Sequence, residues 1–488
     1  MRTRPRSTSL YAALLTLPFA SACRVGPQYR EPELQLPDQW HQAVSEELAA
    51  ESGDFRTWWT VFGDPTLDAL IDRAAAGNLN LEIAAARVRE ARALRRIVKA
   101  DRVPTVDLTG EAGRTKLSDS VDPFARGAYD SYRLDFQASW ELDVWGRVRS
   151  SVDAAGADIQ ATEEALRDLL VLLYAEVAIN YVDLRTYQAR LRFAEGNVAA
   201  QESTLKLVND RFDAQLVPAL DIRQAEMNLA RTQSLLPTLH QNSARAAHRI
   251  AVLLGSEPGA VYELLEQTGA IPASDAAVQV GIPAEVLRRR PDIRQAERAL
   301  AAQTARIGVA EANLYPQFAL TGRFGWDALN GSDLFTSGTQ AWGISIPFRW
   351  NLFDRGRIKG DIAAQEARAD ALQAGYEQTV LLALEEVENS MVSLTTERDR
   401  VGYLQASADA AQQAVELVRE LYNAGLKDFQ PVLDSERTLA EQQDALASSQ
   451  GLVARELIGL YTALGGGWDP EADVEALVAS DRDESDSR

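Results

Sequence analysis

Short stretches of strictly alternating apolar and polar residues recur along this chain. In residues 132–141, aromatic and aliphatic side chains occupy every second position, and charged or polar side chains fill the positions between them. A period of two predicts a β-strand with one apolar and one polar face. Gly- and Asp-containing loops at residues 114–130 and 328–340 join the strands in pairs, so we expect two β-hairpins, 103–141 and 315–350. The four strand candidates are residues 103–113, 132–141, 315–327 and 342–350.

Amphipathic strands with aromatic residues near their ends suit a transmembrane β-barrel, in which ~10 residues per strand suffice. The alternative is the edge of a sandwich with one solvated face, and Pro347 favours either that alternative or a bend in the last strand. Four strands cannot close a barrel, because open edges would leave backbone groups unpaired in hydrocarbon. A barrel therefore requires several copies of the chain. Two copies give eight strands and three give twelve, and the strand pattern does not choose between them.

Each hairpin is followed by an unusually long helical pattern. Residues 150–211 contain no proline and carry apolar residues at spacings of three and four, and residues 357–424 repeat this pattern. About 60 residues at a rise of ~1.5 Å make a rod of roughly 90 Å. Turns at residues 213–218 and 423–428 precede further helical runs, so we expect two helical hairpins. Pro237 should kink the first returning helix.

The chain contains an internal duplication. The sequence around Trp140 matches the sequence around Trp350, 210 residues further on. Upstream of the strands, Pro104 and Pro316 begin a second match at an offset of 212 residues. A repeat of this length predicts that each half builds the same block and that the two blocks pack side by side. Further pairs at the first offset are Glu176 and Glu386, Leu184 and Leu394, Phe212 and Tyr422, and Gly255 and Gly465.

The first residues have the features of an export signal. Basic residues precede an apolar stretch at 10–20, and small residues follow before Cys23, so residues 1–22 are predicted to be a signal peptide. Cys23 is the only cysteine, and the preceding tripeptide is similar to a bacterial lipoprotein box with Ala20 in place of the usual Leu. We expect Cys23 to carry a covalent lipid, N-acyl and diacylglycerol, although an ordinary signal peptide is the simpler alternative. No other segment supplies ~20 consecutive apolar residues, so deeper membrane contact must come from strands.

Charge excludes one class of partner. The 488 residues include 71 acidic and 50 basic side chains, a formal net charge of -21, and no basic stripe is interleaved with aromatic residues. Nucleic acid is therefore not expected as a partner. The acidic excess indicates either a solvated acidic surface or an acidic lumen that favours cations.

Catalytic chemistry has little support in the sequence. His41, His240 and His248 are scattered, and the eight-residue separation of the last two is not the spacing of a metal-binding pair. No Gly-rich phosphate-binding loop opens a helix, and the glycines at 465–467 follow one instead. We therefore expect neither an enzyme nor a resident metal or cofactor. The acidic tail, residues 468–488, ends in a charged segment that we expect to be disordered.

Three further segments carry a family resemblance. They read CRVGPQY at residues 23–29, WWTVFGDPTL at 58–67 and IPAEVLRRRPDI at 282–293. Together with the duplicated hairpins and rods, they make the chain resemble the TolC/OprM-type outer-membrane efflux proteins, in particular the lipoprotein (NodT-type) branch that serves resistance-nodulation-division tripartite pumps. The resemblance implies an α+β membrane protein in which a homotrimer forms a twelve-stranded transmembrane β-barrel, continued by a twelve-helix α-helical barrel with an equatorial mixed domain.

The resemblance also implies where such a duct closes and what it contacts. Asp221 matches an acidic gate position of the family in the first hairpin. In the second hairpin, Pro431 stands where some relatives carry another aspartate, so Asp434 is the expected constriction. Carboxylates crowded on a symmetry axis would attract cations and constrict the channel. The alternative interpretation is that these residues are ordinary solvated charges at helix starts. The other matching gate positions are Tyr422, Lys427 and Arg437. The matching adaptor-docking positions are Ala214, Gln215, Leu216, Ala424, Gly425 and Leu426.

The implied function is passive, gated export of small molecules such as drugs or metal ions. The implied partners are a periplasmic membrane-fusion adaptor, an inner-membrane resistance-nodulation-division pump and outer-membrane lipid. The expected location is the outer membrane of a Gram-negative bacterium, with a lipid anchor and an extension into the periplasm. The alternatives are the outer-membrane duct of a type I protein secretion system and a structural periplasmic coiled-coil lipoprotein.

The predicted organisation has two repeats between shorter segments. Repeat 1 contains the helical hairpin 150–254 and repeat 2 contains the helical hairpin 357–464. The segments are a signal peptide (1–22), an N-terminal equatorial segment (23–78), repeat 1 (79–255), an equatorial linker (256–290), repeat 2 (291–467) and an acidic tail (468–488).

Overall fold

The computed structural model divides into two compact units. Unit 1 comprises Met1–Pro32, Val88–Ala161 and Ala296–Tyr376, and unit 2 comprises Glu33–Arg87, Thr162–Gln295 and Glu377–Arg488. The signal peptide, Cys23 and residues 470–488 lie outside the described residues, so the predictions for them remain predictions. The described residues are 24–34, 36–41, 48–49, 53–116, 118, 127–265, 269–274 and 277–469.

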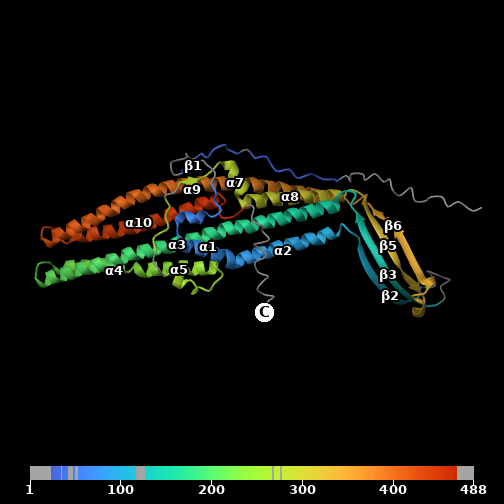
Figure 1. The fold of residues 1–488 in the computed structure, drawn as a ribbon, viewed down its shortest axis with the longest axis horizontal. Coiled ribbons are helices and arrows are strands. Elements are labelled where there is room, and N and C mark those ends of the chain that lie inside the picture. Colours follow the sequence, from blue (N-terminus) through green and yellow to red (C-terminus); the bar gives the residue numbers. More distant parts are fainter. Residues whose placement is uncertain are drawn as a thin grey trace, which may run out of the picture. The chain divides into compact units, whose positions relative to one another are not determined.

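Helices form most of the structure, and Figure 1 shows their order along the chain. The α-helices are α1 (Pro65–Gly77), α2 (Leu79–Ala100), α3 (Arg147–Asp213), α4 (Ala219–Gln233), α5 (Leu236–Leu253), α6 (Tyr262–Leu265), α7 (Pro283–Arg289), α8 (Pro291–Ala312), α9 (Arg357–Asn423) and α10 (Gln430–Ala463). The strands are β1 (Leu48–Ala49), β2 (Thr105–Thr115), β3 (Tyr129–Leu142), β4 (Val278–Gln279), β5 (Gln317–Ala328), β6 (Gln340–Ser345) and β7 (Phe348–Arg349).

Unit 1 contains an antiparallel sheet built from both repeats. Its strand order is β2-β3-β5-β6, with β7 also paired to β5, and Figure 1 shows the four longer strands side by side. The register aligns Leu108, Phe136, Phe324 and Trp342 in one row across the sheet. All four side chains are exposed, Trp342 by 78%. One face of the sheet is therefore apolar and uncovered by the rest of the described chain.

The opposite face of the sheet is held together by ion pairs. Arg133 contacts Glu111 at 3.3 Å and Asp327 at 3.0 Å, which links three strands. Arg323 contacts Asp135 at 2.7 Å and Asp327 at 2.5 Å. Asp135 is only 1% exposed, and Arg323 of the neighbouring strand is its ion-pair partner. The predicted alternation of apolar and polar faces is confirmed.

Proline divides the last predicted strand. Residues 342–350 form β6 and β7 on either side of Pro347 rather than one continuous strand. Proline has no N–H to donate to the ladder, but its carbonyl accepts a hydrogen bond from the Ala319 N–H at 3.0 Å. Both parts pair with β5, so the bend interrupts the edge strand without detaching it.

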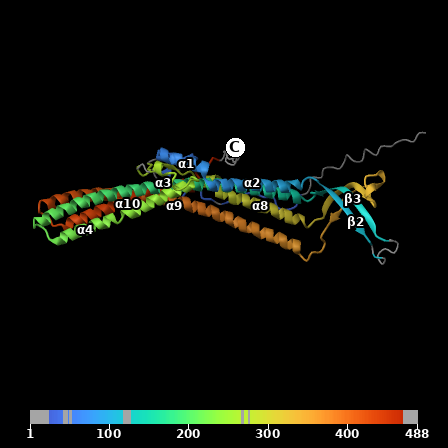
Figure 2. The ribbon, with the colours of Figure 1, turned by 90° about the horizontal axis from the view of Figure 1, so that it is seen from below.

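The long helices follow the predicted hairpins. α3 and α9 each contain 67 residues. The first return is broken into α4 and α5, with Pro237 in the first turn of α5, which confirms the predicted interruption. The second return, α10, is a continuous helix of 34 residues. Figure 2 shows α3, α4 and α10 running alongside one another.

Backbone conformation repeats with the duplication. Three pairs of residues separated by 210 positions have positive φ, where the chain enters or leaves a long helix. Shared left-handed turns at equivalent positions show that both repeats build the same supersecondary block. The pairs are Gly146 (82°) and Gly356 (85°), Gln215 (58°) and Gly425 (74°), and Gly255 (69°) and Gly465 (73°).

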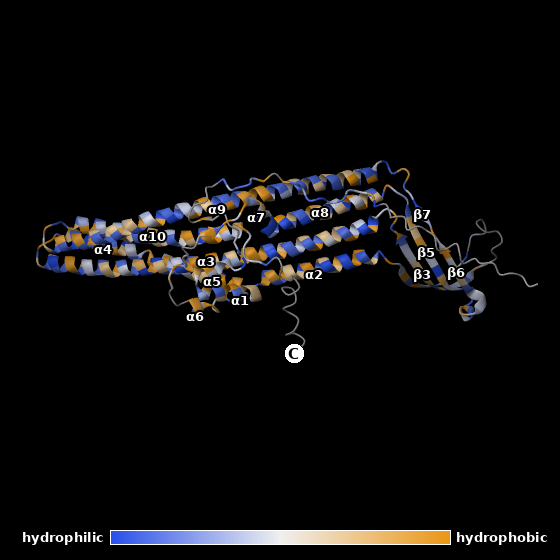
Figure 3. Ribbon diagram, turned by 45° about the horizontal axis from the view of Figure 1, so that its top comes forward, coloured by the Kyte–Doolittle hydropathy of each residue, from blue (hydrophilic) through white to orange (hydrophobic). Residues whose placement is uncertain are grey.

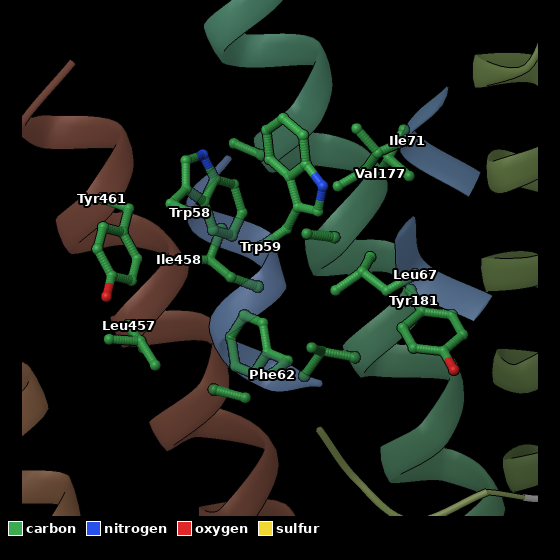
Figure 4. Close-up of a cluster of buried hydrophobic side chains, with 14 of the residues drawn as sticks. Trp58, Trp59, Phe62, Leu67, Ile71, Val177, Tyr181, Leu457, Ile458 and Tyr461 are labelled. Carbon is green, nitrogen blue, oxygen red and sulfur yellow. The ribbon is translucent and has the colours of Figure 1, made fainter. Parts of the chain in front are cut away.

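The main hydrophobic core lies in unit 2 and uses the aromatic WWTVFGDPTL segment. Trp58 stacks on Tyr461 at 5.7 Å between ring centroids, and Trp59 meets Trp58 edge-on at 5.8 Å (Figure 4). The hydroxyl of Tyr181 donates to Asp64 at 2.6 Å, and the Asp64 side chain also accepts N–H bonds at the start of α1. This core joins α1 to α3 and α10.

Hydrophobic and hydrophilic residues are interspersed along α3 and α9 (Figure 3). Within the described part of the chain, none of the helices is both long and apolar enough to cross a bilayer.

Candidate channel gate at the helical tips

Two equivalent turns form the tips of the helical hairpins. At the first, the N–H of Leu216 bonds to the Arg211 carbonyl at 2.9 Å; at the second, the N–H of Leu426 bonds to the Leu421 carbonyl at 2.9 Å. This is the hydrogen-bond pattern of a helix end with a left-handed residue, supplied by Gln215 and Gly425. Leu216 and Leu426 are each 70% exposed. The expected docking positions, including the exposed Ala214 and Ala424, thus lie together at two accessible turns.

Tyr422 is buried at the second tip. Its ring lies 5.4 Å from that of Phe429, and the Arg211 guanidinium lies 4.5 Å above it. Arg211 also donates to the Asn423 carbonyl at 2.8 Å, which ties α3 to the end of α9. Burial raises the pKa of Tyr422, and the neighbouring Arg211 opposes this shift. Arg211 was not among the expected gate residues, because nothing in its sequence context marked it.

Carboxylates gather beside this tyrosine. Asp221 is half-buried in the first turn of α4, and its pKa is raised by burial and by the neighbouring charge of Asp428. Asp428 follows the exposed Lys427 in the second turn. The structure therefore brings Asp221, Tyr422 and Asp428 into one neighbourhood, and Asp428 is a member that sequence reasoning missed.

Asp434 and Arg437 lie further along α10 and pair with each other. Arg437 donates to Asp434 at 3.1 Å, one helical turn apart, and Gln430 donates to the same carboxylate at 3.2 Å. Both side chains of the ion pair are 48% exposed. The Asp434 carboxylate therefore lies half-exposed at the surface of α10.

A buried polar cluster behind the tips connects all four helices. Glu436 of α10 is 4% exposed and accepts hydrogen bonds from Thr204 of α3 at 2.6 Å and from Arg419 of α9 at 2.7 Å. Asn228 of α4 donates to its other oxygen at 3.4 Å. Glu436 was not predicted from the sequence, although apolar residues flank it on the same face of α10. A carboxylate in an apolar stripe requires hydrogen-bonding partners, so this position indicated a buried polar cluster.

Polar pairs continue along the seam between α3 and α10. Their α3 members are spaced every seven residues, so they lie on one face of the helix. Where these helices separate, the groups of each pair can exchange their hydrogen bonds for bonds to water. Above Thr204 and Glu436, the pairs are Asn197 and Gln443 at 2.9 Å, Arg190 and Asp444 at 2.7 Å, and Asp183 and Arg455 at 2.9 Å.

The RRRPDI segment organises the end of repeat 2. Arg290 contacts Asp292 at 2.7 Å and Glu386 at 2.6 Å and donates to the Ala463 carbonyl at 3.0 Å. Arg290 lines a cavity of about 740 Å³ together with Asp168. Burial and the nearby charges of Asp292 and Glu386 raise the pKa of Asp168 to about 6.

No cluster of three or more His, Cys, Asp or Glu side chains that could hold a metal ion occurs among the described residues. His248 has an ordinary structural partner, the Tyr262 hydroxyl, at 2.6 Å from its Nε2.

An amphipathic sheet with two open edges, joined to long helical hairpins with polar seams, defines the protomer of a membrane duct. The family described as "Outer membrane efflux protein" matches residues 70–256 and 282–466. Nodulation protein T of Rhizobium leguminosarum bv. trifolii is 31% identical over 477 residues, covering 97% of this chain and 99% of that protein. Outer membrane protein OprJ of Pseudomonas aeruginosa is 30% identical over 462 residues, covering 94% of this chain and 96% of that protein.

Solved structures agree with these relatives. The outer-membrane channel OprN superposes with a TM-score of 0.87 at 36% identity, covering 92% of this chain and 100% of that one. The Neisseria gonorrhoeae MtrE outer membrane channel superposes with a TM-score of 0.78 at 26% identity, covering 92% and 99%.

This chain belongs to the outer membrane efflux protein family. It is the outer-membrane exit duct of a tripartite efflux pump, a transport function that involves no catalysis. The resemblance read from its motifs and repeats is confirmed. The roles of the individual tip residues and the segment boundaries remain predictions.

Proposed function

We propose that three copies of this chain close into one continuous duct, gated at the helical tips. The observation that carries the proposal is the sheet β2-β3-β5-β6, with β7 beside β6 on β5. It has an exposed apolar face and, among the described strands, open edges at β2 and β6. Successive strands are antiparallel, so β2 and β6 run in opposite directions. The edge of one copy can therefore pair with the opposite edge of the next in the same antiparallel pattern. Three copies supply twelve strands, the number that the family resemblance favours over eight.

We propose in addition that Cys23 carries a lipid anchor. The residues that follow it are fixed against unit 1: Arg24 pairs with Asp153 at 2.7 Å, and the N–H of Val25 bonds to the Trp145 carbonyl at 3.1 Å. Trp145 lies between β3 and α3, where the sheet meets the helices. An acyl chain attached just before Arg24 would start beside the base of the membrane-spanning sheet, which suits insertion into the adjacent leaflet.

The gate is formed by the tips of both hairpins, with Asp434 as the constriction. Three copies of a half-exposed carboxylate near one axis attract cations and narrow the passage. Opening requires α9 and α10 to move away from α3, which breaks the hydrogen bonds and ion pairs of the polar seam between α3 and α10. The exposed turns at Leu216 and Leu426 offer apolar contacts for the hairpin of a periplasmic adaptor.

The cargo is a small molecule delivered by an inner-membrane resistance-nodulation-division pump through that adaptor. Similar proteins carry names as different as a solvent efflux pump component of Pseudomonas putida and a pyoverdine export protein of Pseudomonas aeruginosa. One duct architecture therefore accompanies chemically different cargoes, which supports selection by the pump and adaptor rather than by the duct.

The gate proposal is tested by single-channel recording in planar bilayers. Asp434→Ala should raise the conductance of the closed channel and weaken its cation preference, because it removes the constricting carboxylates. Asp72→Ala, an exposed carboxylate of α1, is the matched control and should leave both unchanged. An unchanged current in the Asp434 variant would remove this residue from the gate. Purified protein that is a stable monomer by mass photometry would contradict the trimeric duct.

A further inference from the structure

Positive charge is concentrated at the end of α2, in an otherwise acidic protein. Residues 89–102 contain six basic and two acidic side chains, whereas the whole chain has 50 basic and 71 acidic. Four of the basic residues are exposed and form no ion pair within the described part of the chain. These four are Arg95, Arg96, Lys99 and Arg102.

The fold itself does not require this charge. At the 212-residue offset, the equivalent positions in repeat 2 are Ile307, Gly308, Glu311 and Leu314, none of which is basic. The end of α8 is also covered, because a Cβ placed on Gly26 would lie only 2.5 Å from the Gly308 Cα. The duplicated blocks thus differ at one surface. The N-terminal segment covers it in repeat 2, whereas in repeat 1 it is basic and no described segment covers it.

The basic surface adjoins the membrane-facing sheet. Only two residues separate Arg102 from β2, and its carbonyl accepts a hydrogen bond from the Trp140 indole N–H of β3 at 3.1 Å. Val106, the first apolar residue of β2, is exposed on the apolar face. At ~3.3 Å per extended residue, Arg102 lies within roughly 13 Å of Val106 along the chain. If Val106 contacts the hydrocarbon core, a distance of this size places Arg102 in the adjacent headgroup layer.

Apolar side chains accompany the charges. Leu94 is 54% exposed and Ile97 is 67% exposed, in the same two turns as Arg96 and Lys99. A helix end that presents both basic and apolar side chains to solvent is suited to the boundary between headgroups and acyl chains.

We infer that the end of α2 binds the anionic phosphate headgroups of phospholipids in the periplasmic leaflet of the outer membrane. Basic side chains next to a membrane-spanning element are attracted to anionic lipid, and Arg and Lys donate hydrogen bonds to phosphate oxygens. The inference rests on the proposed role of the sheet as part of a barrel. It gives each protomer a second attachment beside the lipid on Cys23, at the equivalent place in the other repeat.

The test measures lipid retention by the purified full-length protein. The protein is placed in nanodiscs with equal amounts of phosphatidylglycerol and phosphatidylcholine, and native mass spectrometry counts the lipids that remain bound. The variant combines R96Q, K99Q and R102Q. The matched control combines R73Q, R87Q and R245Q, which removes the same charge from exposed positions of unit 2.

The wild type and the control should both retain phosphatidylglycerol in preference to phosphatidylcholine. Each basic side chain near an anionic surface strengthens binding about fivefold. Loss of three charges should therefore reduce the preference for phosphatidylglycerol at least ~tenfold, once screening by salt is included. Raising the salt concentration should also reduce the preference of the wild type for phosphatidylglycerol. This measurement tests the inference without a mutation.

Two results would overturn the inference. Equal phosphatidylglycerol preference in the wild type and the triple variant would show that this surface does not bind anionic lipid. Dissociation of the triple variant in pure phosphatidylcholine would show that the surface contacts a second copy of the chain instead. In either case, a normal single-channel conductance of the wild type would still support the proposed duct. Failure of the lipid-binding inference can therefore be distinguished from failure of the proposed function.

Discussion

Removing the Glu436 carboxylate should loosen the helical tips. Glu436→Ala deletes the acceptor that Thr204, Arg419 and Asn228 share, and leaves the Arg419 guanidinium without its carboxylate partner. Breaking a buried ion pair by deleting one partner costs about 3–5 kcal/mol. Arg419 is 33% exposed, so water can solvate part of its charge, and we expect a smaller loss than for a fully buried pair, about 2–3 kcal/mol.

The duplication supplies a matched control for this experiment. Glu226 stands 210 residues before Glu436, in α4, and pairs at the surface with Arg223 at 2.7 Å. Glu226→Ala removes a carboxylate from an exposed pair, which contributes about 0–1 kcal/mol. The two variants therefore have the same chemistry and differ in burial.

Hydrogen exchange followed by mass spectrometry reports the effect locally. If the tips open as a unit, about 2–3 kcal/mol makes the amides of α10 around Glu436 exchange roughly 30- to 150-fold faster. The same variant should conduct more current, because the tie between α10 and α3 is weakened. Equal exchange in the Glu436 and Glu226 variants would refute the idea that this cluster holds the four helices together.

Three further predictions follow from backbone geometry and charge. Gly325→Ala should distort the sheet and abolish the proposed trimer in mass photometry, because its Cβ would lie 2.3 Å from a carbonyl oxygen of β3. Gly322→Ala, whose Cβ meets only a methyl carbon at 3.8 Å, should leave the trimer intact. Gln215→Gly should stabilise the first tip by about 0.5–1 kcal/mol in denaturant unfolding, because φ is positive there. Gly425→Ala should destabilise the second tip by a similar amount. The opposite signs would show that the backbone of these turns changes conformation in the variants. The folded pKa of Asp168, about 6, lies above its ordinary value of 3.8, so this group favours folding most at low pH and loses that contribution as pH rises through 6. Asp168→Asn should therefore raise the melting temperature at pH 7.5 and not at pH 4, and an equal shift at both would contradict the assignment.

Periodicity and duplication determined most of the architecture. The alternation in residues 132–141 depends only on which side chains tolerate each face of a strand, so β3 was placed within a few residues. The absence of proline between 150 and 211 similarly marked α3, and Pro237 marked the break between α4 and α5. These features are local, because they follow from backbone chemistry and from side-chain spacing.

Pairings between distant residues were decided only by the tertiary structure. The sequence predicted two hairpins, but it did not show that β3 pairs with β5 and so fuses the two repeats into one sheet. It marked Asp434 by family position, yet neither Arg211 over Tyr422 nor Asp428 beside Asp221 could be read from spacing.

Apolar faces, helix boundaries and the duplication can all be read from the amino-acid pattern. Which polar side chains meet follows from packing: Glu436 is the centre of a four-helix cluster, and the N-terminal segment covers the end of α8, whereas no described segment covers the end of α2. The physical reason is that burial and periodicity act over a few residues of chain, whereas an ion pair depends on two side chains that only packing brings within a few ångströms.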